Sequence, residues 1–278
     1  MTTLAADDRP VCALTTLSDE LFLARSGSLV IDVFDVDSFT LVRRLTIPSV
    51  HRTLLDVVSF GSAGGFSVVD MTSCRRHRCL YVADGCGGTV HRLDRSNGQQ
   101  VAQWSVDGGR RPAGLSVTDA FNVVVSCCDS LSLRVYTPLG CPVCEVSVQR
   151  PAMVGLAHAV QLDCGSFVVI GITESADRLA CVYQNDTDLP DLIDSAGYPI
   201  HMASVSCSAG SYVWLAERGT SAGVRLLQVP ASQCSAYLPK VELREPERIC
   251  WDDSARCLYV VDHGHVKVFR IRMPCDMC

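Results

Sequence analysis

One short apolar segment recurs at near-regular intervals along this chain and constrains its fold more than any other feature. Each copy is five residues long, is rich in branched or aromatic side chains and is followed closely by a turn, which is typical of a buried strand. The copies span residues 21–25, 80–84, 123–127, 167–171, 213–217 and 258–262. After a first interval of 59 residues, their ends are separated by 43, 44, 46 and 45 residues.

Further segments with strand character flank each copy of this run. The segment that follows it spans 31–35, 90–94, 133–137, 180–184, 224–228 or 266–270. Another strand precedes the run in most units, and a fourth follows. Four strands in about 45 residues are typical of one β-propeller blade. The sequence therefore predicts one all-β domain over residues 1–278, a six-bladed β-propeller of four-stranded antiparallel blades.

The two ends of the repeat array carry a further prediction. The sixth unit stops soon after residue 271, which leaves no room for a fourth strand. Because an unpaired strand edge is costly and prone to association, we expect residues 2–6 to return and complete the last blade. The long first interval contains extra residues at 49–66, and their glycines predict a loop between blades one and two.

These units resemble a known repeat family. The resemblance is carried by Pro-Ala-Gly-Leu-Ser-Val at 112–117, by 80–84 together with 90–94, and by 246–269. They are similar to NHL repeats, which form six-bladed propellers at the C-terminus of tripartite-motif proteins and in stand-alone invertebrate relatives. The resemblance implies a rigid scaffold with a protein or peptide partner. Blade four departs most, since Gly171 stands where other blades end in a polar residue.

The charge balance of the chain disfavours nucleic acid and anionic membranes as partners. The chain has 24 Lys+Arg and 30 Asp+Glu, a net charge of -6, which disfavours bulk attraction to nucleic acid or to an anionic membrane. The first residues lack a signal-peptide pattern, and no apolar stretch is long enough to span a bilayer. We therefore expect a cytoplasmic protein whose 16 cysteines are mostly free thiols.

Polar residues align where strands should meet the mouth of the central channel. The first position of the innermost strand holds Asp70, Gly114, His158, His201 and Arg248 in blades two to six. The ends of the second strands and the last hairpin place further charges on the same rim. The candidate partner-binding residues are Asp70, Asp84, His158, His201, Glu217, Arg248, Asp262 and His263. An alternative stays open, in which these side chains only satisfy backbone and turn groups.

Two sets of residues have the chemistry of metal ligands. His158, His201, His263 and His265 could converge on one ion, and two Cys-x-x-Cys pairs occur at 141–144 and 275–278. A histidine in a strand is more often structural, and residues three apart in a strand point to opposite faces. We expect no metal and no cofactor.

Two catalytic hypotheses lack the neighbouring residues or elements that their chemistry requires. Residues 219–223 match G-x-S-x-G, but that nucleophile turn requires a following helix, whereas a strand follows here. A calcium-dependent lactonase needs several oxygen ligands around the channel, yet the matching positions hold Ala113, Ala157 and Ile200, with only Glu247 able to ligate. We therefore expect a non-catalytic scaffold that binds its partner on the loop face around the channel. The alternatives are a lactonase-like hydrolase and an RNA-binding propeller.

Overall fold

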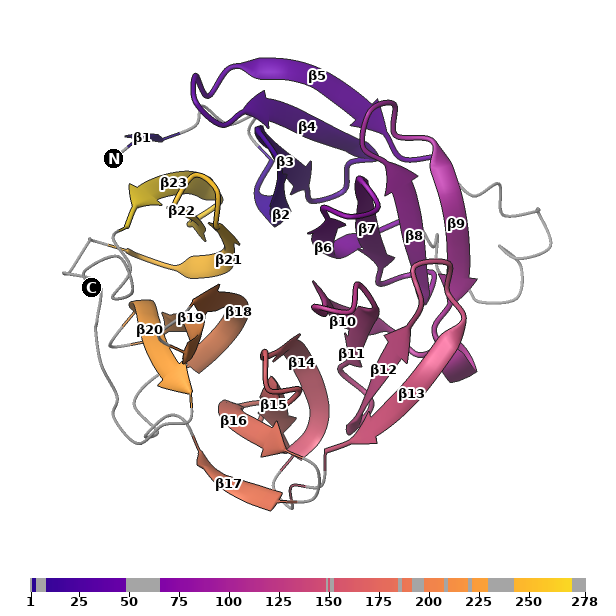
Figure 1. Ribbon diagram of the computed structural model, residues 1–278, viewed down its shortest axis with the longest axis vertical. Coiled ribbons are helices and arrows are strands. Elements are labelled where there is room, and N and C mark those ends of the chain that lie inside the picture. The colour runs from indigo at the N-terminus through magenta and orange to yellow at the C-terminus, as the bar shows by residue number, and fades with distance from the viewer. Residues whose placement is uncertain are drawn as a thin grey trace.

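The computed structural model describes residues 2–3, 9–48, 66–148, 150, 153–184, 187–191, 198–207, 210–219, 222–229 and 243–271. In these ranges the regular structure is all strand, apart from one short 3-10 turn at Asp107–Gly109. The strands form six antiparallel sheets, which stand around a common axis (Figure 1). The prediction of an all-β propeller architecture is confirmed.

Each of the first four sheets contains four strands that are hydrogen-bonded in chain order. The first comprises β2 (Val11–Leu17), β3 (Glu20–Arg25), β4 (Val30–Asp35) and β5 (Leu41–Thr46). The second comprises β6 (Val68–Cys74), β7 (Cys79–Asp84), β8 (Thr89–Asp94) and β9 (Gln100–Ser105). The third comprises β10 (Pro112–Val117), β11 (Val123–Cys127), β12 (Ser132–Tyr136) and β13 (Pro142–Ser147). The fourth comprises β14 (Met153–Gln161), β15 (Phe167–Thr173), β16 (Arg178–Gln184) and β17 (Thr187–Asp191).

The last two sheets differ from this plan. The fifth has three described strands, β18 (Tyr198–Cys207), β19 (Gly210–Arg218) and β20 (Gly223–Val229). The fourth strand that the sequence predicts there, at 237–243, falls almost wholly outside the described residues. The sixth joins β1 (Thr2–Thr3) to β23 (His265–Arg270), β22 (Cys257–Asp262) and β21 (Pro246–Asp252).

Strand β1 is the first strand in the sequence, yet it pairs with β23, the last described strand. Thr2 lies opposite Val268 and Thr3 lies opposite Lys267. The rest of the predicted closing segment, and the predicted loop at 49–65, lie outside the described residues. Completion of the last blade by residues 2–6 therefore stays a prediction.

Burial along the strands explains the sequence repeat. Every residue of β7 and of β22 is buried, because both faces of a second strand pack against neighbouring sheets. A strand buried on both faces reads as a continuous apolar run, which is the feature that recurs in the sequence. The outer strands β5, β9 and β13 are largely exposed. The hydrophobic core thus lies between adjacent sheets, as in the cluster that joins Phe22 and Leu80.

A register shift recurs near the start of every innermost strand. It falls just before one position, which is occupied by Ala13, Asp70, Gly114, His158, His201 or Arg248. A bulge of this kind re-aims the residue that follows it. The sequence alignment found five of these positions and missed Ala13, whose side chain carries no chemical signal. The bulges set the geometry of the ring centre.

Two remaining expectations concern the membrane and the cysteines. Within the described ranges, no helix is long and apolar enough to cross a bilayer. Each cysteine whose side chain the structure describes is a free thiol.

Candidate functional site

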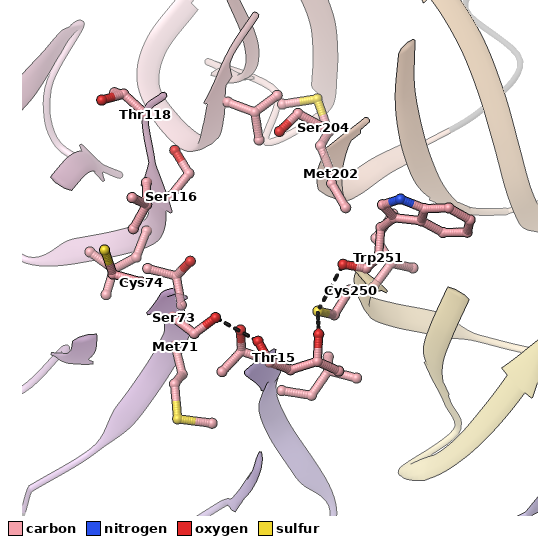
Figure 2. Close-up of a pocket in the computed structure, with 18 of the residues that line it drawn as sticks. Thr15, Met71, Ser73, Cys74, Ser116, Thr118, Met202, Ser204, Cys250 and Trp251 are labelled. Carbon is pink, nitrogen blue, oxygen red and sulfur yellow. Dashed lines mark hydrogen bonds between the residues drawn. The ribbon is translucent and has the colours of Figure 1, made fainter. Parts of the chain in front are cut away.

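The innermost strands enclose a cavity of about 430 Å³ on the ring axis. Strands from all six sheets contribute to its wall, and small hydroxyl-bearing side chains recur there. Figure 2 shows these side chains around an open centre. They include Thr15, Ser73, Ser116, Thr118 and Ser204. The wall can therefore donate and accept hydrogen bonds at several positions along the innermost strands.

Part of this polar wall is engaged within the protein, and part is not. The Ser73 hydroxyl donates to the Thr16 carbonyl oxygen at 2.6 Å, and the Thr16 hydroxyl lies 3.7 Å from the Cys250 sulfur. The Ser116 hydroxyl is buried and makes no hydrogen bond with the described residues. A buried polar group without a partner is costly, whereas Ser204 on the same wall is exposed and available to a ligand in the cavity.

The floor of the cavity is a cluster of Asp70, His158 and His201. The two imidazole rings lie 4.1 Å apart, centroid to centroid, at 41°. His201 Nε2 is 3.4 Å from one Asp70 carboxylate oxygen, and His158 Nε2 is 3.5 Å from the other. These residues come from β6, β14 and β18, so the cluster connects three sheets across the axis.

Backbone groups fix the orientation of this cluster. The Leu115 N–H donates to Asp70 Oδ2 at 2.7 Å. The Ile249 N–H donates to His201 Nδ1 at 3.5 Å, which leaves the ring proton on Nε2, where it is directed at Asp70. His158 Nε2 lies 3.2 Å from the Leu115 carbonyl oxygen, whereas its Nδ1 is buried and has no hydrogen-bond partner among the described residues. The tautomers are inferred from this network.

Burial and charge set the ionisation of the floor. Burial lowers the pKa of His158 to about 3, with a further contribution from His201. Burial also lowers the pKa of His201. For Asp70 burial acts in the opposite direction, but the two histidines and Arg248 outweigh it and hold the pKa of that carboxyl below its usual range. At neutral pH the floor therefore contains one carboxylate and two neutral imidazoles.

Arg248 connects the first residues of three innermost strands through hydrogen bonds. Its guanidinium donates to the carbonyl oxygens of Cys12 and Val69, both at 3.1 Å, and to that of Glu247 at 3.0 Å. Cys12 beside it is not a reactive thiol, because burial raises its pKa to about 11. Arg248 thus acts as a cross-link between sheets as well as a charge near Asp70.

Gly114 holds the equivalent position in the third sheet, and its missing side chain gives the floor its space. A Cβ there would lie 2.7 Å from the Ala157 carbonyl oxygen and 2.7 Å from His158 Cδ2. It would also lie 2.8 Å from the Ser126 hydroxyl, which donates to the Ala157 carbonyl oxygen at 3.2 Å. Glycine is therefore needed for the His158 ring to approach.

The floor also has the composition of a metal site. Asp70, His158 and His201 offer ligand atoms that lie within 4.8 Å of one another, and imidazole with carboxylate is a donor set for zinc or iron. In the structure these atoms contact each other, and Arg248 adds a positive charge beside them. Of the four histidines that the sequence suggested as ligands, two come together. His263 instead is exposed, 3.4 Å from the Glu245 carboxylate, and His265 is also exposed.

The remaining candidate residues lie at the other end of the innermost strands from the cavity. Asp84 Oδ1 accepts the N–H groups of Ser67 and Cys86, both at 3.0 Å. Asp262 Oδ1 accepts two N–H groups, from Arg244 at 2.8 Å and from Glu245 at 2.7 Å.

Glu217 lies 3.2 Å from Arg225. Like Asp84 and Asp262, it is buried. These contacts give all three carboxylates a structural role in their own sheets, and a role in partner binding stays a prediction.

The cavity opens on the face where the innermost strands end. Arg75, Asp119 and Asp253 lie among its lining residues at that end. The binding face predicted from the sequence lies instead at the start of these strands, around the floor. The signal for the cavity is present in the sequence as hydroxyl residues in the second halves of the innermost strands, such as Ser116 and Thr118, but these residues are common in exposed strands as well.

Comparison with known proteins supports the fold. No protein-family model matches the chain, and no curated protein matches its sequence. Among solved structures, a streptogramin B lyase has a TM-score of 0.60 at 10% identity and is covered over 96% of both chains. The Cps50 (Swd1) β-propeller domain of Myceliophteria thermophila has a TM-score of 0.58 at 12% identity, over 94% of this chain and 84% of that one.

A chain of a mitotic checkpoint complex has a TM-score of 0.62 at 11% identity, over 97% of this chain and 77% of that one. At these identities the likeness shows the fold alone. The class of protein is therefore a β-propeller. Its structural neighbours include a lyase and a checkpoint complex, so the fold does not decide between catalysis and binding.

Proposed function

We propose that this chain is a cytoplasmic, non-enzymatic interaction platform. It is an NHL-type propeller of six blades, closed by its N-terminal segment, and it binds a segment of a protein partner at the central cavity. The observation that carries the proposal is the cavity of about 430 Å³, which has hydroxyl-bearing walls and a floor of side chains bonded to one another.

The contacts of the floor favour a structural role for its acid and base groups. The imidazoles of His158 and His201 are directed at Asp70 and at backbone groups. General acid–base catalysis requires such a group within reach of a bound substrate and with a pKa near the working pH. The lowered pKa values of both histidines oppose that use.

The open end of the cavity indicates the chemistry of the partner. Burial raises the pKa of Asp119, and the nearby Asp163 carboxylate raises it further. Two carboxylates held together attract a cation. Arg75, the cation among the lining residues, is already 3.3 Å from Asp252. A lysine or arginine side chain of an extended peptide would meet Asp119, while its backbone would bind wall hydroxyls such as Ser204.

Affinity purification with matched variants tests this proposal. Asp119→Arg reverses the charge at the cavity opening, and Ser116→Phe fills the cavity. Val101→Lys and Val143→Lys are controls, because both residues are exposed on outer strands, at 52% and 50%. We expect the first pair to lose the same partner by at least about tenfold and the controls to retain it. Equal recovery with all four variants would exclude the cavity as the binding site.

A further inference from the structure

Two cysteines face each other at the hairpin between β6 and β7. Cys74 ends β6, Cys79 begins β7, and the two are partners in the strand register. Directly opposed residues in antiparallel strands have Cα atoms about 4.5–5.5 Å apart. A disulfide requires about 4.4–6.8 Å between Cα atoms. The backbone therefore already holds the two thiols at a spacing that a disulfide can bridge.

A histidine of the same hairpin contacts one of the two thiols. His77 Nδ1 lies 3.2 Å from the Cys74 sulfur. The His77 ring packs edge-on against Phe121, with 6.1 Å between centroids and 87° between planes. Because Phe121 supports the ring from the loop between β10 and β11 of the third blade, the imidazole is held in position beside the sulfur.

The two thiols are electrostatically unequal. The hydrogen bond from Cys79, followed by those from His77, lowers the pKa of Cys74 to about 5 against the opposing effect of burial. The same hydrogen bond, together with burial, raises the pKa of Cys79 above its usual range. The His77 imidazole beside the Cys74 sulfur favours the thiolate at Cys74, which leaves Cys79 as the thiol. A nucleophilic thiolate beside a protonated second thiol is the arrangement from which a disulfide forms.

Access to the pair is narrow. Both cysteines are 1% exposed, and they lie directly beneath the four-residue turn 75–78. His77 and Arg78 of this turn line a second hollow, of about 670 Å³, with residues of blades one and two. Cys74 itself is among the residues that line the central cavity of about 430 Å³. Because both cysteines are buried, a small oxidant has better access to them than a bulky peptide disulfide has.

We propose that Cys74 is a reactive thiol that reduces hydrogen peroxide, with Cys79 as its resolving partner. The Cys74 thiolate attacks one peroxide oxygen and the O–O bond breaks. The departing hydroxide takes a proton and leaves as water, and Cys74 becomes a sulfenic acid. The Cys79 sulfur then attacks the Cys74 sulfur, the S–O bond breaks, and a second water leaves with the Cys79 proton. In sum, two thiols and one peroxide give one disulfide and two waters.

Blade six contains a matched hairpin without this chemistry. Cys257 begins β22 as Cys79 begins β7, and both are followed by Leu-Tyr-Val. The register partner of Cys257 is Asp252 rather than a cysteine. Burial raises the pKa of Cys257. Cys257 is therefore an internal control for a buried thiol in the same place of the fold.

Disulfide mapping on the unmodified full-length chain tests the proposal. The folded protein is treated with hydrogen peroxide, the remaining thiols are alkylated, and the protein is digested with trypsin. Trypsin cleaves after Arg75, Arg76 and Arg78, so the peptide of Cys74 stays joined to the peptide of Cys79 only through a disulfide. The second peptide also contains Cys86, and fragmentation of the linked pair distinguishes Cys79 from Cys86. We expect this linked pair to form, to disappear on reduction with dithiothreitol, and to exceed any linked product of Cys257 by at least about tenfold.

Two variants separate the steps. In Cys79→Ser the sulfenic acid at Cys74 has no resolving thiol, so dimedone labelling of Cys74 should rise well above that of Cys257. In His77→Gln the rate of oxidation at Cys74 should fall roughly fivefold, with circular dichroism used to verify the fold of each variant. Oxidation of the exposed Cys86 or Cys128 without a 74–79 linkage in the unmodified chain would overturn the proposal. Equal dimedone labelling of Cys74 and Cys257 would do so as well.

Discussion

Asp70 of β6 and His201 of β18 meet across the central channel, with 3.4 Å between Oδ1 and Nε2, although 131 residues separate them in the sequence. The other carboxylate oxygen of Asp70 accepts the N–H of Leu115 from β10. One side chain thus connects the second, third and fifth sheets. Because it is buried and charged, its contribution to stability depends on all of these partners.

Replacing Asp70 by asparagine should destabilise the ring. Asp70→Asn keeps the shape but removes the negative charge that faces His201 and balances Arg248. We expect the free energy of unfolding to fall by about 2–4 kcal/mol, as measured by denaturant titration. Asp37→Asn, at an exposed position, is the control and should change it by less than about 0.5 kcal/mol. Equal stability of both variants would show that the channel contact is not a structural cross-link.

The buried histidines should make stability depend on pH. Unfolded histidine binds a proton below its ordinary pKa of 6.5, whereas folded His158 does so only at about 3. Between these values the unfolded state binds more protons, so the free energy of unfolding falls as the pH is lowered. In His158→Gln the slope between pH 7 and pH 5 should be shallower, by up to about 1.4 kcal/mol per pH unit. An unchanged slope would contradict a buried neutral imidazole.

A second ionic cross-link joins blades one and two on the outer side. The Glu20 carboxylate accepts hydrogen bonds from Arg43 and, at 2.7 Å, from Arg95 Nε. Glu20→Gln should lower the free energy of unfolding by about 1–3 kcal/mol, because two guanidinium groups lose their anion. The exposed Arg134–Glu145 pair is the matched control, and Glu145→Gln should cost less than about 0.5 kcal/mol. Thermal or chemical unfolding of both variants gives the comparison, and equal losses would contradict it.

The fold could be predicted from the sequence because the second strand of each sheet is buried on both faces and is therefore a continuous apolar run. The run at 80–84 appears in the structure as β7, and the run at 258–262 appears as β22. The turn that follows β8 is local as well, since Asp94 Oδ1 accepts the Ser96 N–H and Gly98 has φ of 72°. Local patterns of this kind report on local structure, so strand positions were predicted well.

The site was less predictable because it depends on contacts between distant residues. Asp70, His158 and His201 were identified by alignment, but nothing in the spacing showed that their side chains meet. Asp84 and Asp262 share the chemistry of a binding residue, yet each is committed to N–H groups of its own sheet. The cavity wall was missed because Ser116 and its neighbours look like ordinary strand residues.

A calcium titration distinguishes a non-enzymatic propeller from a calcium-dependent hydrolase. The positions at which such enzymes carry oxygen ligands hold Ala113, Ala157 and Ile200. We therefore expect the melting temperature to be unchanged by millimolar calcium. A ligand that binds only the folded state raises the melting temperature with its concentration. A rise of several degrees with increasing calcium would favour the hydrolase alternative.

Site-specific photocrosslinking tests whether a partner binds at the cavity, because it reports which face of the propeller the partner touches. A photoreactive amino acid is introduced at Asp119, at the opening of the cavity, and separately at Val143, which is exposed on the outer strand β13. Each variant is irradiated in cell extract, and the adducts are identified by mass spectrometry. We predict one protein adduct from position 119 that is absent from position 143 and is lost in the Ser116→Phe background. The same adducts from both positions, or a specific adduct from position 143 alone, would contradict binding at the channel.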